Sequence, residues 1–407
     1  MTRNLHLRGK GGNKIIFSVN GPDCKTSKGG REVASRECTD VFVVGGGPAG
    51  LAAAIAARQK GFSVIVADGS VPPIDKSCGE GLLPDTLAVL ESLGVKFARG
   101  AGQGFRGITF IQNGLQVSAD FPRGQGIGLR RPLLHERLVA RAEECGVQFL
   151  WKTTVTGIIS GRGAGSVQLP ERNIRARWIV GADGQGSRVR RWVGLESISR
   201  VRHRYASRRH FRVKPWSSCM EIHWAGKTQA YVTPIGEEEV CVVVMAETPA
   251  HGLFKAELHE MPALREKLLG ASLSSRERGA VTAMRTLRRV QKNNVALLGD
   301  ASGGVDAITG DGLRLAFRQA LVLADAMAAN DLTQYQRAHR KLARRPMLMG
   351  NLMVWLGRNP RIRARVLRAM HDNPKLLARL LATHVGDGSP AHLVATGARL
   401  GLRLLAS

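Results

Sequence analysis

The chain has 407 residues, 43% of them hydrophobic, which is enough to bury a large core in one large domain or two interlocked ones. Its 60 lysines and arginines against 32 acids give a formal net charge of +28, which favours acidic partners such as nucleic acid, anionic lipid or phosphorylated substrates. No apolar run is long enough to span a bilayer, and the six cysteines show neither a Cys-x-x-Cys pair nor metal-ligand spacing, so we expect no metal site and a reducing, cytoplasmic compartment.

The N-terminal segment, residues 1–38, is rich in glycine, serine and basic residues. It lacks the apolar core of a secretory signal, and we expect a basic, disordered extension. An organelle transit peptide is the alternative, although Asp23, Glu32 and Glu37 interrupt the basic pattern.

Residues 41–50 contain the most informative pattern of the chain. An apolar run ends in a glycine cluster and an alanine-rich helical pattern follows at once, which predicts a strand, a tight turn and a helix. Gly45, Gly47 and Gly50 occupy the positions of a Gly-x-Gly-x-x-Gly motif, where glycine permits the turn, the approach of a pyrophosphate and close helix–strand packing. Pro48 and Ala49 lie within the motif, and the helix N-terminus that follows offers free N–H groups to phosphates.

A second apolar strand ends at Asp68, about twenty residues beyond the start of the motif, where a carboxylate can accept hydrogen bonds from ribose hydroxyls. Strand, helix, second strand and acid together predict a dinucleotide site in an α/β fold. The alternative is a glycine-rich turn in an ordinary α/β unit.

The middle of the chain mixes loops, helices and strands. A turn-rich loop precedes a helix predicted over 84–93, and Asn113-Gly114 between two apolar runs predicts a β-hairpin. Arg131 opens a helix with proline in its first turn, and Asp183-Gly184 follows another apolar strand. Strand-like stretches then dominate residues 195–284, with one short helix near 262–269.

A third glycine–acid motif begins at Gly299-Asp300. Because Asp300 ends an apolar strand, its carboxylate is expected at the sheet edge where ligands bind, and there it can accept hydroxyl groups. Gly310 and Gly312 then open a predicted helix, whose bare N–H groups can face a planar ring that carries negative charge. The alternative is that Asp300 caps a helix and the glycines form a plain loop.

Beyond Gly312 the pattern is helical almost to the end. The arginines thicken after Arg337 and are mixed with Leu, Met and Val rather than with the aromatic side chains on which single-stranded nucleic acid stacks. We therefore expect no nucleic-acid partner. A basic, partly apolar region that touches a membrane surface is one interpretation, and arginines on solvated faces in a chain from a high-GC genome are the other.

The three motifs together resemble those of FAD-dependent oxidoreductases of the para-hydroxybenzoate hydroxylase-like group, which includes aromatic and polyketide monooxygenases, flavin halogenases and geranylgeranyl reductases. The similarity covers the chain from Asp40 to about Met327. It implies an α/β fold with a Rossmann-like FAD-binding domain interleaved with a β-sheet substrate domain, followed by a C-terminal helical region. We expect the FAD-binding domain over 39–105, 125–195 and 285–330, the substrate domain over 106–124 and 196–284, and the helical region over 331–407.

The resemblance also implies roles for single residues. In that family the first motif holds the ADP half of FAD, and the segment that matches Asp183-Gly184 lies near the cofactor and the path of the nicotinamide. Gly299-Asp300 matches the motif that holds the ribityl chain. Arg131 matches the family arginine beside the flavin, with Arg130 as an adjacent competitor. The family often has proline where Ala307 stands.

Two segments resemble the substrate side of these enzymes. The loop with Cys78 is similar to the Cys-Gly-x-Gly loop of geranylgeranyl reductase-like sequences, and Cys78 is a structural thiol, a redox partner or merely a small side chain. Prenyl reductases carry a tryptophan and an aromatic–proline pair where this chain has only Tyr231 and Pro234. Cys78 and Tyr231 are therefore candidate catalytic residues, whereas His203, His210 and His223 are interpreted as surface or pocket polar groups.

The leading hypothesis for function is a monooxygenase. NAD(P)H reduces FAD, and oxygen adds at the flavin C4a to give a hydroperoxide that hydroxylates or epoxidises a lipophilic aromatic, polyketide or isoprenoid substrate. The alternative is a prenyl double-bond reductase of the geranylgeranyl type. The sequence has no second strand–Gly-x-Gly-x-x-Gly–helix unit, so we expect NAD(P)H to dock transiently or another protein to supply electrons. We expect a cytoplasmic enzyme, with peripheral membrane contact through its basic C-terminal region.

Overall fold

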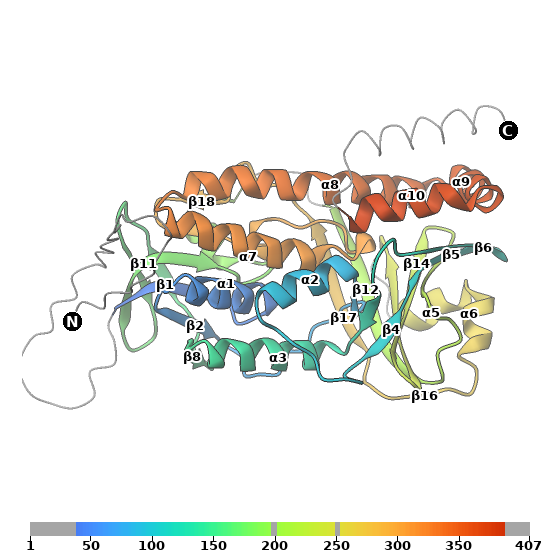
Figure 1. The fold of residues 1–407 in the computed structure, drawn as a ribbon, viewed down its shortest axis with the longest axis horizontal. Coiled ribbons are helices and arrows are strands. Elements are labelled where there is room, and N and C mark those ends of the chain that lie inside the picture. The colour runs from blue at the N-terminus through green and yellow to red at the C-terminus, as the bar shows by residue number, and fades with distance from the viewer. Residues whose placement is uncertain (1–37, 197–201, 249–252, 387–407) are drawn as a thin grey trace, which may run out of the picture.

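The computed structural model describes residues 38–196, 202–248 and 253–386. The extension expected over residues 1–38 lies outside these ranges, apart from Cys38, which begins the first strand. The described chain is elongated, with one large sheet toward each end and long helices along one side (Figure 1). The predicted α/β architecture is confirmed.

The first large sheet is the parallel sheet expected around the glycine motif. Its apolar strands are buried because helices pack on them, as is typical of parallel sheets. In spatial order it contains β18 (Gln291–Lys292), β19 (Val295–Leu297), β11 (Asn173–Gly181), β1 (Cys38–Val44), β2 (Val64–Asp68) and β8 (Gln148–Trp151), with β10 (Gly165–Gln168) paired to β11 and β9 (Gly157–Ile159) paired to β10.

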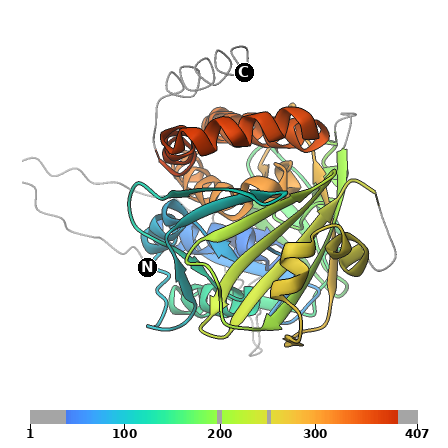
Figure 2. The same ribbon diagram turned by 90° about the vertical axis from the view of Figure 1, so that its right-hand side faces the viewer.

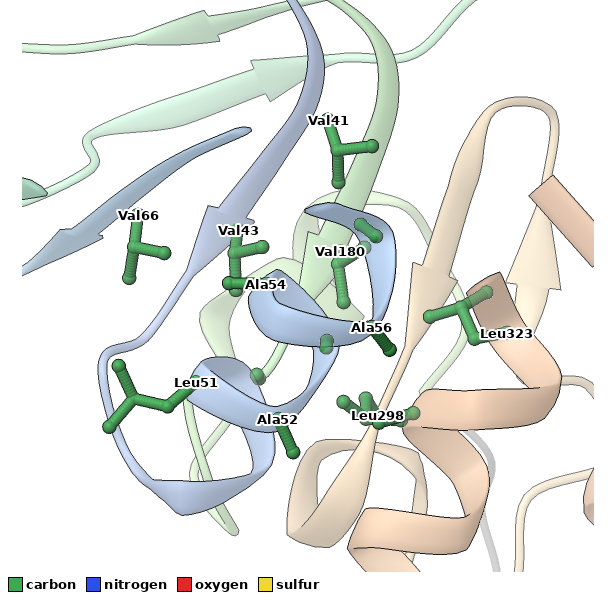
Figure 3. Close-up of a cluster of buried hydrophobic side chains, with 14 of the residues drawn as sticks. Val41, Val43, Leu51, Ala52, Ala54, Ala56, Val66, Val180, Leu298 and Leu323 are labelled. Atoms are coloured by element: carbon green, nitrogen blue, oxygen red, sulfur yellow. The ribbon is translucent and has the colours of Figure 1, made fainter. Parts of the chain in front are cut away.

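Helix α1 (Pro48–Gln59) lies between this sheet and α7 (Gly312–Ala328). Its buried face is made largely of alanine, and these small side chains let the neighbouring elements approach closely. Figure 3 shows Val43 and Val66 of the strands on one side of α1 and Leu323 of α7 on the other. Helix α3 (Arg131–Glu144) packs against α1 as well.

The second large sheet is mostly antiparallel. The predicted hairpin at Asn113-Gly114 is confirmed, because both residues adopt the positive φ angles, +49° and +80°, of a tight hairpin turn. In spatial order the sheet contains β16 (Ser272–Leu273), β12 (Arg202–Arg212), β15 (Glu239–Ala246), β14 (Thr228–Gly236), β13 (Met220–Ala225), β5 (Gly107–Gln112) and β6 (Leu115–Asp120), with β17 (Arg278–Met284) also paired to β12.

Helices cover both faces of this second sheet. The short helices α5 (Leu253–His259) and α6 (Pro262–Lys267) lie on its outer face (Figure 2). Helices α9 (Pro360–Asp372) and α10 (Pro374–Val385) pack on the other face, and α8 (Leu332–Arg358) runs along the upper edge of Figure 1 from the first sheet toward them. Within the described ranges no helix is long and apolar enough to cross a membrane.

Shorter elements connect the two sheets. A third sheet of three short strands and the helix α2 lie between them, and the predicted helix over 84–93 is confirmed. These elements are β3 (Gly81–Leu82), β4 (Gln103–Phe105), β7 (Gly126–Gly128), α2 (Pro84–Ser92) and α4 (Arg188–Trp192). The division into domains given above stays a proposal.

One predicted strand is shorter than expected. The apolar strand before Asp300 ends at Leu297, and residues Gly299–Ser302 form a 3₁₀ turn, η1, instead of continuing the strand. Gly299 adopts φ +56°, which breaks the extended conformation. Asp300 therefore lies in a turn just beyond the strand.

The carboxylate of Glu80 joins the two halves of the molecule. It is buried and accepts hydrogen bonds from the backbone N–H of Arg131 at 3.0 Å, from Nη1 of Arg208 at 2.9 Å and from Nε2 of His210 at 2.7 Å. Arg208 also donates to both carboxylate oxygens of Asp75, at 3.0 and 2.9 Å. The loop 75–81, the start of α3 and strand β12 are thereby tied together.

A second buried contact holds the turn η1. The Ser302 hydroxyl donates to the carbonyl of Gly299 at 2.8 Å, so it accepts a hydrogen bond from Nε2 of His339 at 2.9 Å. Burial lowers the pKa of His339 from its ordinary 6.5 to about 4, with a smaller effect from Arg340. The imidazole therefore stays neutral in the folded protein.

Replacement of Glu80 by glutamine is expected to destabilise the fold by about 3 kcal/mol, because it leaves the buried Arg208 guanidinium with an incomplete set of charged partners. Urea unfolding measures the difference. The matched control is Asp120→Asn, which breaks the exposed pair with Arg106 and is expected to cost less than about 1 kcal/mol. Equal losses in both variants would contradict the structural role of Glu80.

Acidification is expected to weaken the fold through His339. Its folded-state pKa is lower than its unfolded value, so its contribution is complete above pH 6.5 and is lost as the pH falls toward about 4. The loss amounts to up to about 3 kcal/mol of unfolding free energy. In His339→Gln, which keeps a donor for Ser302, urea unfolding over this range is expected to show a correspondingly shallower pH dependence, and an unchanged slope would contradict this assignment.

Candidate active site

The glycines of the first motif fall into two kinds. A Cβ atom at Gly45, where φ is +109°, would lie 2.5 Å from the carbonyl oxygen of Ala182, and one at Gly50 would overlap the carbonyl oxygen of Gly45. These two glycines are required for packing between β1, β11 and α1. A Cβ atom at Gly47 would meet no atom of the described residues within 4 Å. Gly47 therefore presents its backbone to open space at the start of α1, where Pro48 is the first helical residue.

Asp68 supports the same turn. One carboxylate oxygen accepts the backbone N–H of Gly46 at 2.7 Å and the other accepts that of Ser70 at 2.8 Å. The side chain was predicted to accept ribose hydroxyls, and it remains only partly buried beside the glycine turn. Asp68 therefore holds the turn in place while keeping lone pairs for a ligand.

A small hollow lies where η1 meets α7. Asp300 lines this hollow, and although many protein atoms surround its side chain, the residue as a whole is exposed. Burial raises the pKa of Asp300, and the positive charges of Lys76 and Arg131 oppose the rise. The lining residues are Gly299, Asp300, Gly303, Gly304, Val305, Gly312, Leu315, Ala316 and Gln319.

Two glycines in the loop before α7 have free space beside their backbone. Gly310 adopts φ +67°, and in the part of the chain that the structure describes, a Cβ atom at Gly310 or at Gly312 would meet nothing within 4 Å. Helix α7 begins at Gly312, and no side chain caps its first N–H groups, because Asp311 is paired with Arg314. This helix end therefore offers bare N–H groups beside the hollow.

Asp183 has a structural role that the sequence did not indicate. Its carboxylate accepts hydrogen bonds from the Ser187 hydroxyl at 2.5 Å and from the backbone N–H groups of Arg188 at 2.7 Å and Val189 at 3.1 Å. It therefore caps the start of α4. Gly184 adopts φ +81°, and a Cβ atom there would lie 3.6 Å from Nζ of Lys76, which also acts on Asp300.

The adjacent arginines have separate partners. Arg130 forms an ion pair with Glu239 of β15. The Nη1 atom of Arg131 lies 4.0 Å from Sγ of Cys78, and its charge acts on Asp300. Arg131 therefore connects the Cys78 loop with the hollow.

Tyr231 lies in the apolar cluster between the second sheet and the C-terminal helices. Its hydroxyl donates to Gln229 at 3.3 Å, and burial raises its pKa, so it stays protonated. The next inward residue of β14, Thr233, donates to the carbonyl of Gly79 at 2.7 Å. Strand β14 thus contacts the Cys78 loop through Thr233, while Tyr231 packs into the core.

Two histidines differ from expectation. His203 is exposed, whereas His210 and His223 are buried and paired with Glu80 and Glu221, so these two are not surface groups, and their interpretation as pocket groups stays a prediction. In the described ranges the ligand atoms of Glu80, His210 and Cys241 lie within 4.8 Å of one another. The Arg208 guanidinium already supplies the positive charge at this place, so the carboxylate is satisfied by protein groups.

Sequence inspection missed this buried charge network. Arg204, Arg208 and His210 alternate along β12, a pattern that ordinarily marks a solvated strand face, whereas here that face points inward. Arg204 similarly pairs with the buried Asp306 at 2.9 Å. In the sequence, the acidic residue Glu80 was a hint that the charged face of β12 has a buried partner.

These features fit a bound dinucleotide with a planar ring system. The open backbone at Gly47 suits a pyrophosphate, the hollow beside Asp300 suits a polyhydroxylated chain, and the uncapped start of α7 suits an anionic ring edge. Each of the three comes from a different part of the sequence, yet all lie at the carboxyl edge of the same parallel sheet.

Comparison with known proteins supports the same cofactor. The FAD binding domain family matches residues 38–334. A menaquinone reductase of Mycolicibacterium smegmatis is 27% identical over 323 residues, which cover 74% of this chain and 78% of the relative. A digeranylgeranylglycerophospholipid reductase of Methanococcoides burtonii is 28% identical over 317 residues, or 72% of this chain and 76% of the relative.

The fold is also similar to solved structures. The p-nitrophenol 4-monooxygenase of Pseudomonas putida superposes with a TM-score of 0.73 at 19% identity, covering 86% of this chain and all of the monooxygenase. Reductases and a monooxygenase thus share the architecture described above. The chain belongs to the FAD binding domain family, and it is an FAD-dependent oxidoreductase.

Proposed function

We propose that the chain uses FAD to saturate a double bond of a lipophilic isoprenoid compound. The observation that carries this proposal is the position of the Cys78 loop, which Glu80 holds against Arg131 at the edge of the FAD site. The relatives named as menaquinone and digeranylgeranylglycerophospholipid reductases support the same substrate class. These names shift the preference from oxygen transfer toward double-bond reduction.

The FAD roles assigned to single residues are part of the proposal. The backbone from Gly45 to Gly50 binds the pyrophosphate at the start of α1, and Asp68 accepts ribose hydroxyls. Asp300 accepts hydroxyls of the ribityl chain. The remaining contacts beside the ring system come from Arg131, Asp183, Gly184, Gly299, Gly310 and Gly312.

Bound FAD supplies hydride chemistry, and we propose that NAD(P)H docks transiently to reduce it. The protein's task is then to orient an apolar substrate, exclude water and provide a proton. Phe105 and Met220 pack against the Cys78 loop at Gly81, so the substrate side of the loop is bounded by apolar groups.

Cys78 is the proposed proton donor. Its thiol is free and only partly buried, and Nη1 of the Arg131 guanidinium lies 4.0 Å from Sγ. The backbone N–H of Glu80 donates to the same sulfur at 3.4 Å. Since Tyr231 lies in the core with its hydroxyl engaged, it is a weaker candidate.

The second candidate function is a monooxygenase acting on a similar lipophilic substrate. The segment from Ala230 to Gly236 favours it, because it lacks the tryptophan and the aromatic–proline pair that the prenyl reductases carry there. The cofactor site and the apolar surroundings serve both reactions equally.

Gly47→Ala is expected to weaken FAD binding about tenfold or more, because the added methyl group enters the space proposed for the pyrophosphate. The protein itself has room for that methyl group, so the stability of the FAD-free form is expected to stay unchanged. Flavin fluorescence titration and thermal unfolding measure the two quantities. The control is Gly163→Ala, at a second glycine with open surroundings. Loss of apoprotein stability or unchanged FAD affinity in Gly47→Ala would contradict the assignment.

Anaerobic turnover of menaquinone or a geranylgeranyl lipid with NAD(P)H is expected to consume the nicotinamide at its aerobic rate. Cys78→Ala is expected to lower kcat about tenfold or more with unchanged FAD content, because the proton must then come from a less well placed donor. Cys145→Ala, at a partly buried free cysteine after α3, is the control. Turnover that requires oxygen would exclude the reductase.

A further inference from the structure

The exposed face of α8 carries a continuous stripe that packing does not explain. Arg337, Lys341 and Arg344 are followed on the same face by Leu348, Leu352 and Trp355, with spacings of three and four residues throughout. The three apolar side chains are 59%, 40% and 47% exposed. Single exposed apolar residues are common, but three on successive turns form a patch.

The surroundings of the patch are strongly basic. Helices α8 to α10 contain one acidic residue, Asp372, within the described ranges. The exposed cations of these helices are Arg337, Arg340, Lys341, Arg344, Arg358, Arg361, Arg365, Arg368, Lys375 and Arg379. Of these, Arg358 pairs with Glu247, so most of the positive charge faces solvent.

The opposite face of α8 lies close to the active site. A Cβ atom at Gly350 would lie 3.6 Å from Asp306 and 3.8 Å from Thr309, in the loop that leads to Gly310 and Gly312. At Gly357 a Cβ atom would lie 3.3 Å from Trp224 of the second sheet. Because both positions are glycine, α8 packs closely against the loop before α7 and against the second sheet.

We propose that this face of α8, with the arginines of α9, docks on an anionic lipid bilayer. An apolar stripe flanked by arginine and lysine is the pattern of helices that lie in the membrane interface, where the apolar side chains enter the acyl boundary and the cations contact lipid phosphates. A second copy of this chain fits poorly, because its own α8 to α10 surface carries the same charge and offers only Asp372 for pairing.

The inference rests on the proposed function in one respect, which is that a lipophilic substrate resides in the bilayer. Docking would then place the α8 face at the membrane with the flavin site directly behind it. The docking face of α8 was inferred from the exposure and charge of its side chains alone. Membrane binding can therefore be tested without any measurement of turnover.

The test is co-sedimentation of the full-length, FAD-loaded protein with vesicles. Vesicles of phosphatidylcholine alone are compared with vesicles that contain an equal share of phosphatidylglycerol. We expect binding to the anionic vesicles that weakens with added salt, and a blue shift of tryptophan fluorescence that is absent in Trp355→Phe.

Two variants separate the contributions. Leu348→Ser with Leu352→Ser is expected to lower vesicle affinity about tenfold or more, and the triple change Arg337→Gln, Lys341→Gln and Arg344→Gln about a hundredfold. The control is Leu269→Ser with Leu273→Ser, which changes two exposed leucines, one just after α6 and one in β16, and is expected to leave binding unchanged.

Equal binding to both vesicle types, or unchanged binding of both α8 variants, would overturn the proposal. So would a concentration-dependent dimer in light scattering that the α8 leucine changes abolish, because the stripe would then be a contact between copies of the chain. Since vesicle binding requires no substrate, failure of the reductase assay with normal vesicle binding would refute the proposed function alone.

Discussion

The buried carboxylate of Glu80 is the contact on which the arrangement of the site depends. It accepts hydrogen bonds from two distant segments, the start of α3 and strand β12, and Arg208 of β12 donates in addition to Asp75 in the same loop as Glu80. A buried carboxylate surrounded by donors tolerates little displacement, because any lost partner leaves charge without compensation in a region of low dielectric constant. Helix α3 beside the first sheet, strand β12 of the second sheet and the Cys78 loop are therefore held in one relative position.

The proposed cofactor site depends on glycines, whose lack of a side chain leaves room for close backbone packing and for a ligand. Gly45 and Gly50 allow backbone segments to meet, whereas Gly47, Gly310 and Gly312 leave space beside exposed N–H groups. In an FAD-binding fold of this kind, the residues around the flavin ring determine which reaction takes place. In the proposed function, the partly buried Cys78 beside Arg131 is the group that would direct the enzyme toward reduction.

Local patterns predicted most of the fold. The glycine turn, the hairpin at Asn113-Gly114 and the C-terminal helices depend on neighbouring residues, so their signals are complete within short segments. The charge network was not predictable in this way, because Glu80 and Arg208 are distant in sequence and the charged alternation of β12 indicates a solvated face. The cap formed by Asp183 was missed for a related reason, since one Asp-Gly pair suits both a cofactor contact and a helix N-terminus.

The most direct measurement of the central claim is the mass of the product formed by the FAD-loaded protein from a geranylgeranyl lipid or menaquinone in air with NAD(P)H. If Cys78 and the flavin act as proposed, the product gains a pair of hydrogens and, in heavy water, at least one solvent-derived deuterium on carbon. Incorporation of an oxygen atom from molecular oxygen, with the double bonds otherwise intact or epoxidised, would contradict the reductase account and establish the monooxygenase.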